Sequence, residues 1–181
     1  MTTSPRLDEL AGDYDLDTAG TRIGFTARHA MGTRVRGRFD EFAGSARLTG
    51  DDASLRVEVV IQAASVRTGN RQRDEHVRRH FLNVGTYPVI TFTSTTADLV
   101  GEAGFAVTGD LTVRGVTKPI TVKVELIRAR HGPPDDLRVH LAGNATADRG
   151  AWGVNWNAMT VALVNRHVTI ELDAMAIRRP C

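Results

Sequence analysis

The sequence predicts an all-β domain, an antiparallel barrel or sandwich of about eight strands with one short helix in a long connection. Apolar and polar residues alternate along most of the chain, which is the period of a strand with one buried face. Turn-forming residues separate the alternating segments, which favours antiparallel pairing of consecutive strands. Residues 71–82 carry helical spacing instead.

The alternation also predicts which residues face inward. The expected inward positions are Ile23, Phe25, Ala27 and His29; Val35, Gly37 and Phe39; Phe42, Gly44, Ala46 and Leu48; Val57, Val59 and Ile61; Ile90 and Phe92; Phe105, Val107, Gly109, Leu111 and Val113; Ile120, Val122, Val124 and Leu126; Leu137, Val139, Leu141, Gly143, Ala145 and Ala147; and Val168, Ile170, Leu172, Ala174 and Ala176. The set changes from odd to even numbers at Asp40-Glu41 without a turn. That change predicts a bulge or bend, and long bent strands close small barrels.

The expected interior mixes large rings with small residues. An eight-stranded barrel is about wide enough to be filled by side chains or to hold one small ligand. Phenylalanines and small residues share the inward faces, so a packed core and a cavity both fit the pattern. The small residues favour the cavity, and they are Ala27, Gly37, Gly109, Gly143, Ala145 and Ala147.

The helix is expected over residues 71–82, with Asn70 as its N-cap. Val77 and Phe81 are spaced i, i+4 and are expected to face the barrel, with Arg78 and Arg79 outward. Extended structure returns at Tyr87-Pro88, because proline disfavours helix in the residue before it.

Polar side chains of this region allow more than one role. His76 and His80 have the spacing of two metal ligands, but no further histidine is close in sequence, so a surface helix is favoured and no metal site is expected. Arg73 and Asp74 either fix the helix to the barrel as an ion pair or orient a ligand headgroup. His29 is expected at the barrel rim.

The Gly- and Asn-rich segment from Gly150 to Asn157 holds two tryptophans, Trp152 and Trp156. Glycine weakens a regular strand. This segment is therefore expected to form either a cap over one end of the barrel or a surface turn.

Composition excludes several classes of function. The 181 residues favour one domain, and 23 basic against 21 acidic residues give a net charge of only +2, so no nucleic-acid partner is expected. Cys181 is the sole cysteine, so no internal disulfide can form.

The N-terminus lacks a basic stretch followed by an apolar run, so cytoplasmic localisation is expected, with residues 1–12 disordered or loosely packed. No catalytic triad, nucleophile elbow or phosphate-binding loop is present, so no enzyme is expected.

Several motifs follow one another in a fixed order. The first third carries Tyr14-x-Leu16-Asp17, Ile23-x-Phe25-x-x-x-His29 and Gly37-x-Phe39-x-x-Phe42-x-Gly44. The middle carries Ser65 with Thr68-Gly69-Asn70, Arg73-Asp74-x-His76, Phe81, Tyr87-Pro88, and Thr91-Phe92 with Ser94-Thr95. Then come Val107-Thr108-Gly109-Asp110-Leu111-Thr112, Arg114-Gly115-Val116-Thr117-Lys118-Pro119, Asp148-Arg149-x-x-x-Gly153 and Val168-Thr169-Ile170. From about Tyr14 to Ile177, the chain resembles the YceI-like family of lipocalin-like barrels that hold isoprenoid lipids.

The resemblance implies an eight-stranded antiparallel lipocalin-like barrel over residues 13–178. It also implies sequestration or transport of a long isoprenoid of the quinone or polyprenyl phosphate type, with no cofactor, catalysis or metal. Transient membrane contact and a homodimer are further expectations. Gly20-Thr21, Arg79 and Leu82 depart from the family pattern near regions of ligand contact. The residues expected to bind the ligand are Phe25, His29, Phe39, Arg73, Asp74, His76, Phe81, Phe92, Phe105, Leu111, Trp152 and Trp156.

Two alternatives stay open beside the carrier. One is a stress-linked interaction module with a filled barrel and no lipid. The other is a small-molecule enzyme that uses His29 or His76 as acid or base.

Overall fold

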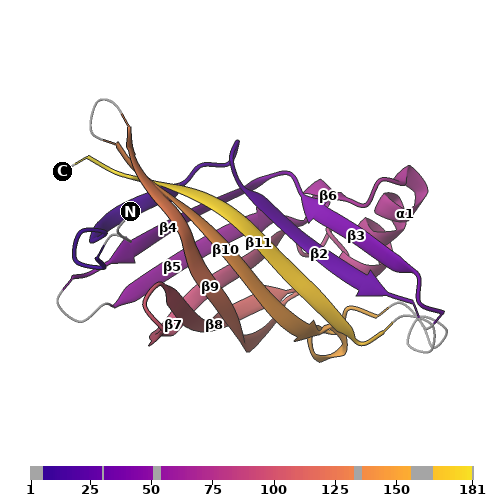
Figure 1. Ribbon diagram of the computed structural model, residues 1–181. Helices are drawn as coiled ribbons and strands as arrows, with labels where there is room; N and C mark the ends of the chain where they lie inside the picture. The colour runs from indigo at the N-terminus through magenta and orange to yellow at the C-terminus, as the bar shows by residue number, and fades with distance from the viewer. Residues whose placement is uncertain (1–5, 30, 51–53, 133–135, 156–164, 181) are drawn as a thin grey trace.

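The computed structural model describes residues 6–29, 31–50, 54–132, 136–155 and 165–180, which form one antiparallel sheet (Figure 1). Its strands are β1 (Gly12–Leu16), β2 (Arg22–Arg28), β3 (Arg34–Phe39), β4 (Phe42–Leu48), β5 (Leu55–Gln62), β6 (Val66–Arg67), β7 (Val89–Val100), β8 (Gly104–Val113), β9 (Val116–Gly132), β10 (Asp136–Asp148) and β11 (His167–Arg178). The helical segments are η1 (Ala63–Ser65), α1 (Arg71–His76), η2 (Val77–Leu82) and η3 (Arg149–Trp152).

The sheet closes on itself through β1. This strand pairs with β4 along one edge, where Tyr14 lies opposite Ala46, and with β11 along the other, where Tyr14 lies opposite Arg178. The order β1-β4-β5-β7-β8-β9-β10-β11 therefore forms a ring of eight antiparallel strands. The predicted eight-stranded antiparallel barrel is confirmed.

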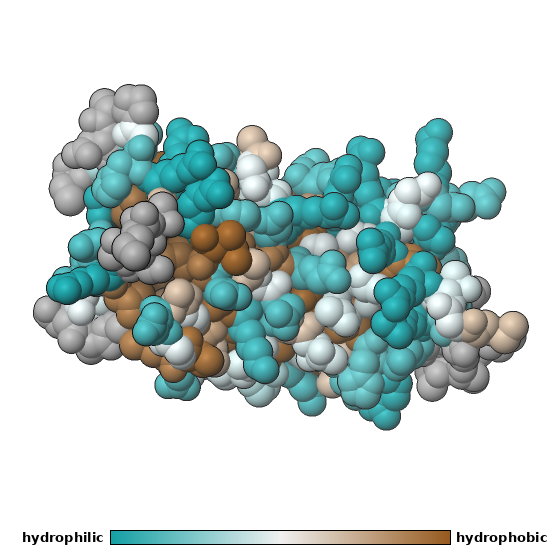
Figure 2. All heavy atoms as spheres, in the orientation of Figure 1, coloured by the Kyte–Doolittle hydropathy of each residue, from teal (hydrophilic) through white to brown (hydrophobic). Residues whose placement is uncertain are grey.

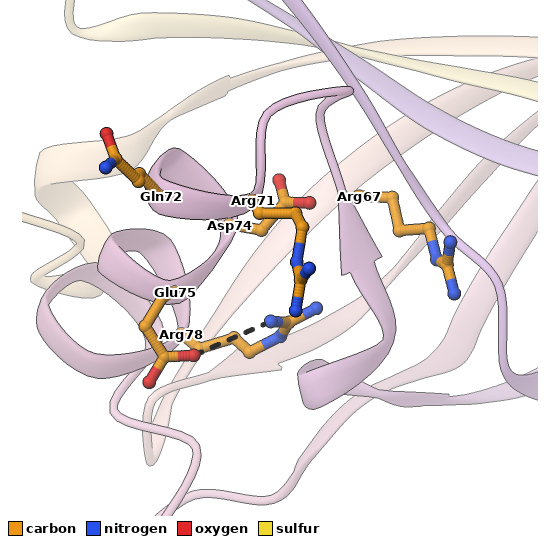
Figure 3. Close-up of a pocket in the computed structure, with 6 residues that line it drawn as sticks. All are labelled: Arg67, Arg71, Gln72, Asp74, Glu75 and Arg78. Atoms are coloured by element: carbon orange, nitrogen blue, oxygen red, sulfur yellow. Dashed lines mark ion pairs between the residues drawn. The ribbon is translucent and has the colours of Figure 1, made fainter.

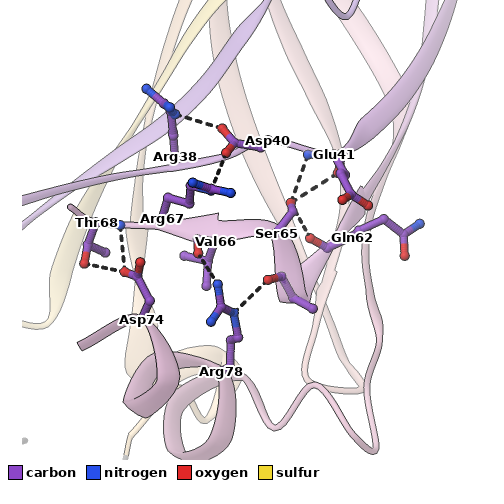
Figure 4. A network of polar contacts seen from close by, with 11 residues as sticks. Arg38, Asp40, Glu41, Gln62, Ser65, Val66, Arg67, Thr68, Asp74 and Arg78 are labelled. Atoms are coloured by element: carbon purple, nitrogen blue, oxygen red, sulfur yellow. Dashed lines mark hydrogen bonds and ion pairs between the residues drawn. The ribbon is translucent and has the colours of Figure 1, made fainter. Parts of the chain in front are cut away.

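Bent strands make the closure possible. β11 pairs with β1 near its end and with β2 nearer its start, so β1 and β2 follow one bent path across the barrel wall. β3 and β4 are likewise separated only by Asp40 and Glu41, which confirms the predicted bend. Ser65 of η1 holds this bend, because its hydroxyl accepts a hydrogen bond from the Glu41 amide at 3.0 Å and donates one to the Gln62 carbonyl at 2.7 Å (Figure 4).

The helix made of α1 and η2 lies between β6 and β7, and its predicted range of 71–82 is confirmed. The Asn70 side chain accepts a hydrogen bond from the Arg73 amide at 3.0 Å, as expected of the N-cap. The second half, η2, is a π-helix. A π-turn has i→i+5 spacing, so Leu82, five residues after Val77, joins it in the barrel-facing cluster. The expectation that Phe81 fills this place is wrong, and its ring lies 5.7 Å from that of His76.

Core clusters occupy both ends of the barrel. One contains Leu10, Tyr14, Leu48, Leu137, Val139 and Ala176. Leu10 is 5% exposed and its carbonyl accepts a hydrogen bond from the Tyr14 hydroxyl at 2.6 Å. The described part of the N-terminal segment thus packs onto the barrel, where the sequence analysis expected loose packing. At the other end, η1, β6 and η2 contribute Ala63, Val66 and Leu82 to a second cluster, and Trp152 joins a third.

Candidate functional site

The barrel interior has an apolar lining that is only partly covered. Along β5 exposed residues alternate with partly buried ones, and none of the inward residues Leu55, Val57, Val59 and Ile61 is fully buried. The same holds for inward residues of β9 and β11, namely Val122, Val124, Ile170 and Leu172. A close-packed core removes side chains almost entirely from solvent. The inner wall therefore retains apolar surface that its own side chains leave uncovered.

Two glycines of the inner wall are covered by phenylalanine rings. A Cβ atom at Gly37 would lie 2.2 Å from Cζ of Phe25, and one at Gly109 would lie 2.7 Å from Cζ of Phe92. The inference that these two glycines leave room for a ligand is therefore wrong, because each makes space for the ring of the neighbouring strand.

The four expected phenylalanines lie at different levels of the barrel. Phe25 and Phe39 pack beside the second cluster, with ring centroids 5.8 Å apart. Phe92 packs against the cluster of Trp152, and Leu111 contacts both of these clusters. Phe105 packs near Leu10 and Tyr14 at the opposite end. Together the rings mark the length of the interior rather than one pocket.

Trp152 covers one end of the barrel. Its side chain is 5% exposed and packs with Ile120, Ala145 and Ala147. The indole N–H donates a hydrogen bond to the Leu111 carbonyl at 2.8 Å. Of the two expectations for this segment, the structure supports the cap over a surface turn. Trp156 lies outside the described residues.

Arg149, only 7% exposed, holds the backbone around this cap. Its guanidinium donates to the carbonyls of Val154 at 3.0 Å and Asn165 at 3.1 Å, and also contacts the side chain of Asn155. Burial lowers the pKa of the guanidinium, and the charge of Asp148 opposes that shift. The sequence includes Arg149 in a motif but carries no signal for this role.

A second arginine ties the cap to the helix. Arg114 sits in the tight β8–β9 turn with a left-handed φ of 52°. Its guanidinium donates to the Gly153 carbonyl at 2.9 Å and to the Phe81 carbonyl at 3.3 Å. The end of η2, the β8–β9 turn and the segment after Trp152 are thus held together at one rim of the barrel.

Arg73 and Asp74 both bind Thr68, and Figure 4 shows the contact of Asp74. The buried Asp74 carboxylate accepts hydrogen bonds from the Thr68 amide at 2.7 Å and from its hydroxyl at 2.6 Å. Arg73 donates to the same hydroxyl at 2.8 Å and to the Thr68 carbonyl at 2.7 Å. These contacts support the structural role of fixing the helix, although they are made through Thr68 rather than as an ion pair between the two residues.

Asp74→Ala is expected to destabilise the protein by about 2 kcal/mol, because it removes a charged acceptor and leaves the Thr68 amide without its partner. Thermal unfolding measures the loss, and hydrogen exchange is expected to quicken first in residues 71–82. Glu75→Ala, on the exposed side of α1, is the matched control. Equal unfolding temperatures for the two variants would contradict this role for Asp74.

The described residues around His76 and His80 do not form a set of metal ligands. The rings of His76 and His80 lie 4.7 Å apart. Across the described ranges, no group of three or more histidine, cysteine or acidic side chains could hold a metal ion. His29 is exposed in the turn after β2, and its amide donates to the Thr33 carbonyl at 2.8 Å. It thus lies at the end of the β2–β3 hairpin, where sequence analysis placed the rim.

A polar groove of about 640 Å³ lies between β6 and α1, outside the barrel (Figure 3). In this view the Arg71 side chain points toward that of Arg78, while Arg67 extends from β6. Arg78, expected to point outward, donates instead to the carbonyls of Ala64 at 2.8 Å and Val66 at 3.1 Å. Three arginines line the groove together with Gln72 and the carboxylates of Asp74 and Glu75, so it lacks the apolar residues that line the barrel interior.

Three aspartates, one exposed and two partly exposed, make the stability of the fold depend on pH. Hydrogen bonds from Arg47, Arg179 and Arg166 hold the pKa values of Asp13, Asp15 and Asp148, respectively, below their ordinary range. A carboxyl whose pKa is lower in the folded than in the unfolded state stabilises the fold above its unfolded pKa. That contribution is lost as the pH falls through the folded pKa.

The unfolding temperature is therefore expected to fall as the pH drops below about 4, where unfolded aspartates take up protons first. Differential scanning fluorimetry across the acid range measures this. Asp148→Asn is expected to lower the unfolding temperature at neutral pH and to flatten the acid decline. A variant with the same acid decline as the wild type would contradict the assignment.

The fold and the site define a class of protein, a small closed antiparallel barrel with an apolar interior and a capped rim. A YceI-like domain model matches residues 14–176. A UPF0312 protein of Pseudomonas paraeruginosa is 34% identical over 174 residues, covering 94% of this chain and 89% of that protein. One from Shewanella putrefaciens is 30% identical, covering 93% and 89%. The chain belongs to the YceI-like family.

Solved structures show the same fold. Burkholderia cenocepacia BcnA superposes with a TM-score of 0.77 at 23% identity, covering 89% of this chain and 99% of that one. A polyisoprenoid binding domain from Saccharophagus degradans gives a TM-score of 0.71 at 20% identity, covering 92% and 98%. In the part of the chain that the structure describes, no helix has the length and apolar character needed to span a membrane.

Proposed function

We propose that this protein binds a long-chain isoprenoid lipid inside its barrel and sequesters or transports it without chemical change. The observation that carries the proposal is the inner wall, whose central valines and leucines stay partly exposed on a face that points away from bulk solvent. A soluble domain gains from covering such surface. The solved polyisoprenoid binding domain of the same fold supports the choice of ligand class.

The physical chemistry of an isoprenoid suits this interior. Each buried CH₂ group contributes about 0.8 kcal/mol, so one five-carbon unit contributes about 4 kcal/mol. Ordering a flexible chain offsets part of that gain. A narrow barrel lined by valine, leucine and phenylalanine contacts a branched chain along its whole length, so affinity is expected to grow with chain length until the interior is full.

A quinone or polyprenyl phosphate headgroup would lie at the rim, where polar side chains gather. His29 and Arg73 are exposed there, and arginine suits phosphate and carbonyl oxygens. Asp74 acts on the ligand through the helix that it anchors. Apart from Trp156, the residues proposed to contact or position the ligand are Phe25, His29, Phe39, Arg73, Asp74, His76, Phe81, Phe92, Phe105, Leu111 and Trp152.

One observation favours the alternative of an interaction module. Leu99, Val100 and Ile127 are 48%, 57% and 51% exposed. Figure 2 shows hydrophobic surface gathered around the part of the molecule where β7 and β8 lie. Exposed apolar side chains that lie together mark contact surfaces in soluble proteins. A partner held there would need no occupied interior.

Calorimetric titration of lipid-free protein with polyprenyl phosphates of increasing length, held in dilute detergent, tests the proposal. Saturable binding of one lipid per chain, tightening with each added isoprene unit, is expected. An unbranched alkyl phosphate with the same number of carbons is the control, and it should bind more weakly. Absence of uptake at every chain length would leave the filled-barrel alternative.

A further inference from the structure

Six arginines lie close together on the outside of β2, β3, β6 and the start of α1, although the whole chain is nearly neutral. We call Arg28, Arg34, Arg36, Arg38, Arg67 and Arg71 the arginine face. In the strand register Arg28 lies directly opposite Arg34, and Arg38 directly opposite Arg67. Like charges directly opposite one another destabilise a sheet. Asp40 bridges the second pair, so the repulsion that remains is between Arg28 and Arg34, and a partner of opposite charge could relieve it.

Few acidic side chains lie close enough to neutralise the positive charge of the arginine face. Asp40 accepts from Arg38 at 2.8 Å and from Arg67 at 2.7 Å. Glu75 of α1 is bound by Arg78 and Arg79. The acidic residues of neighbouring β11, Glu171 and Asp173, lie beside Gly24 and Arg22. The Glu171 carboxylate accepts a hydrogen bond from the Thr26 hydroxyl at 3.4 Å, and Thr26 lies opposite Arg36, but neither acidic residue forms an ion pair with the arginine face among the described residues.

Four guanidiniums remain available for an outside partner. Among the residues that the structure describes, no ion pair involves Arg28, Arg34, Arg36 or Arg71. Their positive charge therefore faces solvent.

An apolar side chain projects beside these arginines. Met31, in the turn between β2 and β3, is 91% exposed, the largest value among the exposed large hydrophobic residues. Arginines flank it at the end of β2 and the start of β3. A protruding apolar residue among cations is the arrangement that inserts into the boundary of an anionic bilayer while the cations bind headgroups.

The arginine face also adjoins the rim of the barrel. The Asn165 amide donates to the Arg28 carbonyl at 2.8 Å, and the Asn165 carbonyl accepts from Arg149, which holds the Trp152 cap. The β2–β3 hairpin extends to the same end of the molecule as α1 (Figure 1). In Figure 2 that end is mostly hydrophilic.

We propose that the arginine face and Met31 dock this protein on the surface of an anionic lipid bilayer, with the Trp152 end of the barrel toward the membrane. The bilayer would be a second partner of the proposed carrier. Only the biological purpose of docking rests on the proposed function. Docking would bring the rim to the surface where an isoprenoid is held. Met31 favours a bilayer over nucleic acid, because a nucleic-acid backbone offers no apolar phase for it.

Co-sedimentation with isoprenoid-free vesicles tests the docking. Wild-type protein is expected to bind vesicles of phosphatidylcholine mixed with phosphatidylglycerol, not those of phosphatidylcholine alone, and to dissociate as salt rises. Each arginine near an anionic surface contributes about fivefold in binding, so R34Q/R36Q is expected to bind about 30-fold more weakly. Met31→Ser should weaken binding several-fold.

The matched control is R56Q/R128Q, which removes the same charge from exposed positions of β5 and β9. Both lie next to residues of the Leu10 cluster, at the other end of the barrel. This variant is expected to bind vesicles within about twofold of the wild type, since its arginines lie outside the proposed contact. Equal binding by R34Q/R36Q and the control would overturn the docking surface.

Three further outcomes test the inference, and the last two separate it from the proposed function. Duplex DNA that displaces the protein from anionic vesicles and binds it more tightly would overturn the bilayer as partner. Isoprenoid uptake in detergent without vesicle binding would overturn docking and leave the carrier. Vesicle binding without isoprenoid uptake would leave docking and overturn the carrier.

Discussion

Phe92→Glu is expected to abolish isoprenoid binding while the barrel still folds. Phe92 faces the interior, packs against the cluster of Trp152 and covers Gly109. A carboxylate at position 92 would lose its hydration shell when the apolar lipid chain enters the barrel. Burying an unpaired charge in this way costs several kcal/mol. Affinity should therefore fall by at least about 100-fold.

Controls separate lost binding from lost folding. Val60→Glu puts the same charge on the outer face of the neighbouring strand, where Val60 is 41% exposed, and should bind lipid as the wild type does. Phe92→Trp adds volume without charge and should weaken long isoprenoids more than short ones. Circular dichroism reports the fold of each variant. Undiminished lipid binding by folded Phe92→Glu would contradict an interior site.

Arg149→Met is expected to cause the largest loss of stability. The change keeps much of the side-chain volume but removes the donors to the carbonyls of Val154 and Asn165. Leaving a buried acceptor without its donor costs about 1–3 kcal/mol, so the two losses together should cost about 3 kcal/mol. For a domain of this size, the unfolding temperature should fall by about 10 °C.

The neighbouring Arg166 provides the control for Arg149. Its exposed side chain donates to Asp148 at 2.6 Å, so Arg166→Met should change the unfolding temperature much less. Trp152 fluorescence should shift toward the red in Arg149→Met as its cap loosens. If Arg149→Met and Arg166→Met unfold at the same temperature, the buried arginine does not hold the cap.

Much of the barrel follows from sequence because each strand shows one face to water. Alternation predicts the inward residues of β5, and the change of parity at Asp40-Glu41 predicts the break between β3 and β4. The pairing of β1 with both β4 and β11 could not be predicted in this way. It joins residues near 14 to residues near 177, and no local pattern reports such a contact.

The site is harder to predict from sequence because it depends on pairs of residues. Gly37 reads as empty space until the strand register places Phe25 over it. Leu82 replaces Phe81 in the core because a π-turn changes the spacing, and propensities carry no sign of that turn. The arginine face did leave a signal, arginine at positions 34, 36 and 38, but the small net charge concealed it.

Native mass spectrometry of the purified protein, followed by solvent extraction, tests the central claim most directly. The account predicts an added mass of one lipid per chain, released into solvent as a quinone or a polyprenyl species. Such a complex should be missing from folded Phe92→Glu and retained by Val60→Glu. A wild-type protein that carries no lipid and takes up none of the isoprenoids supplied to it would contradict the carrier.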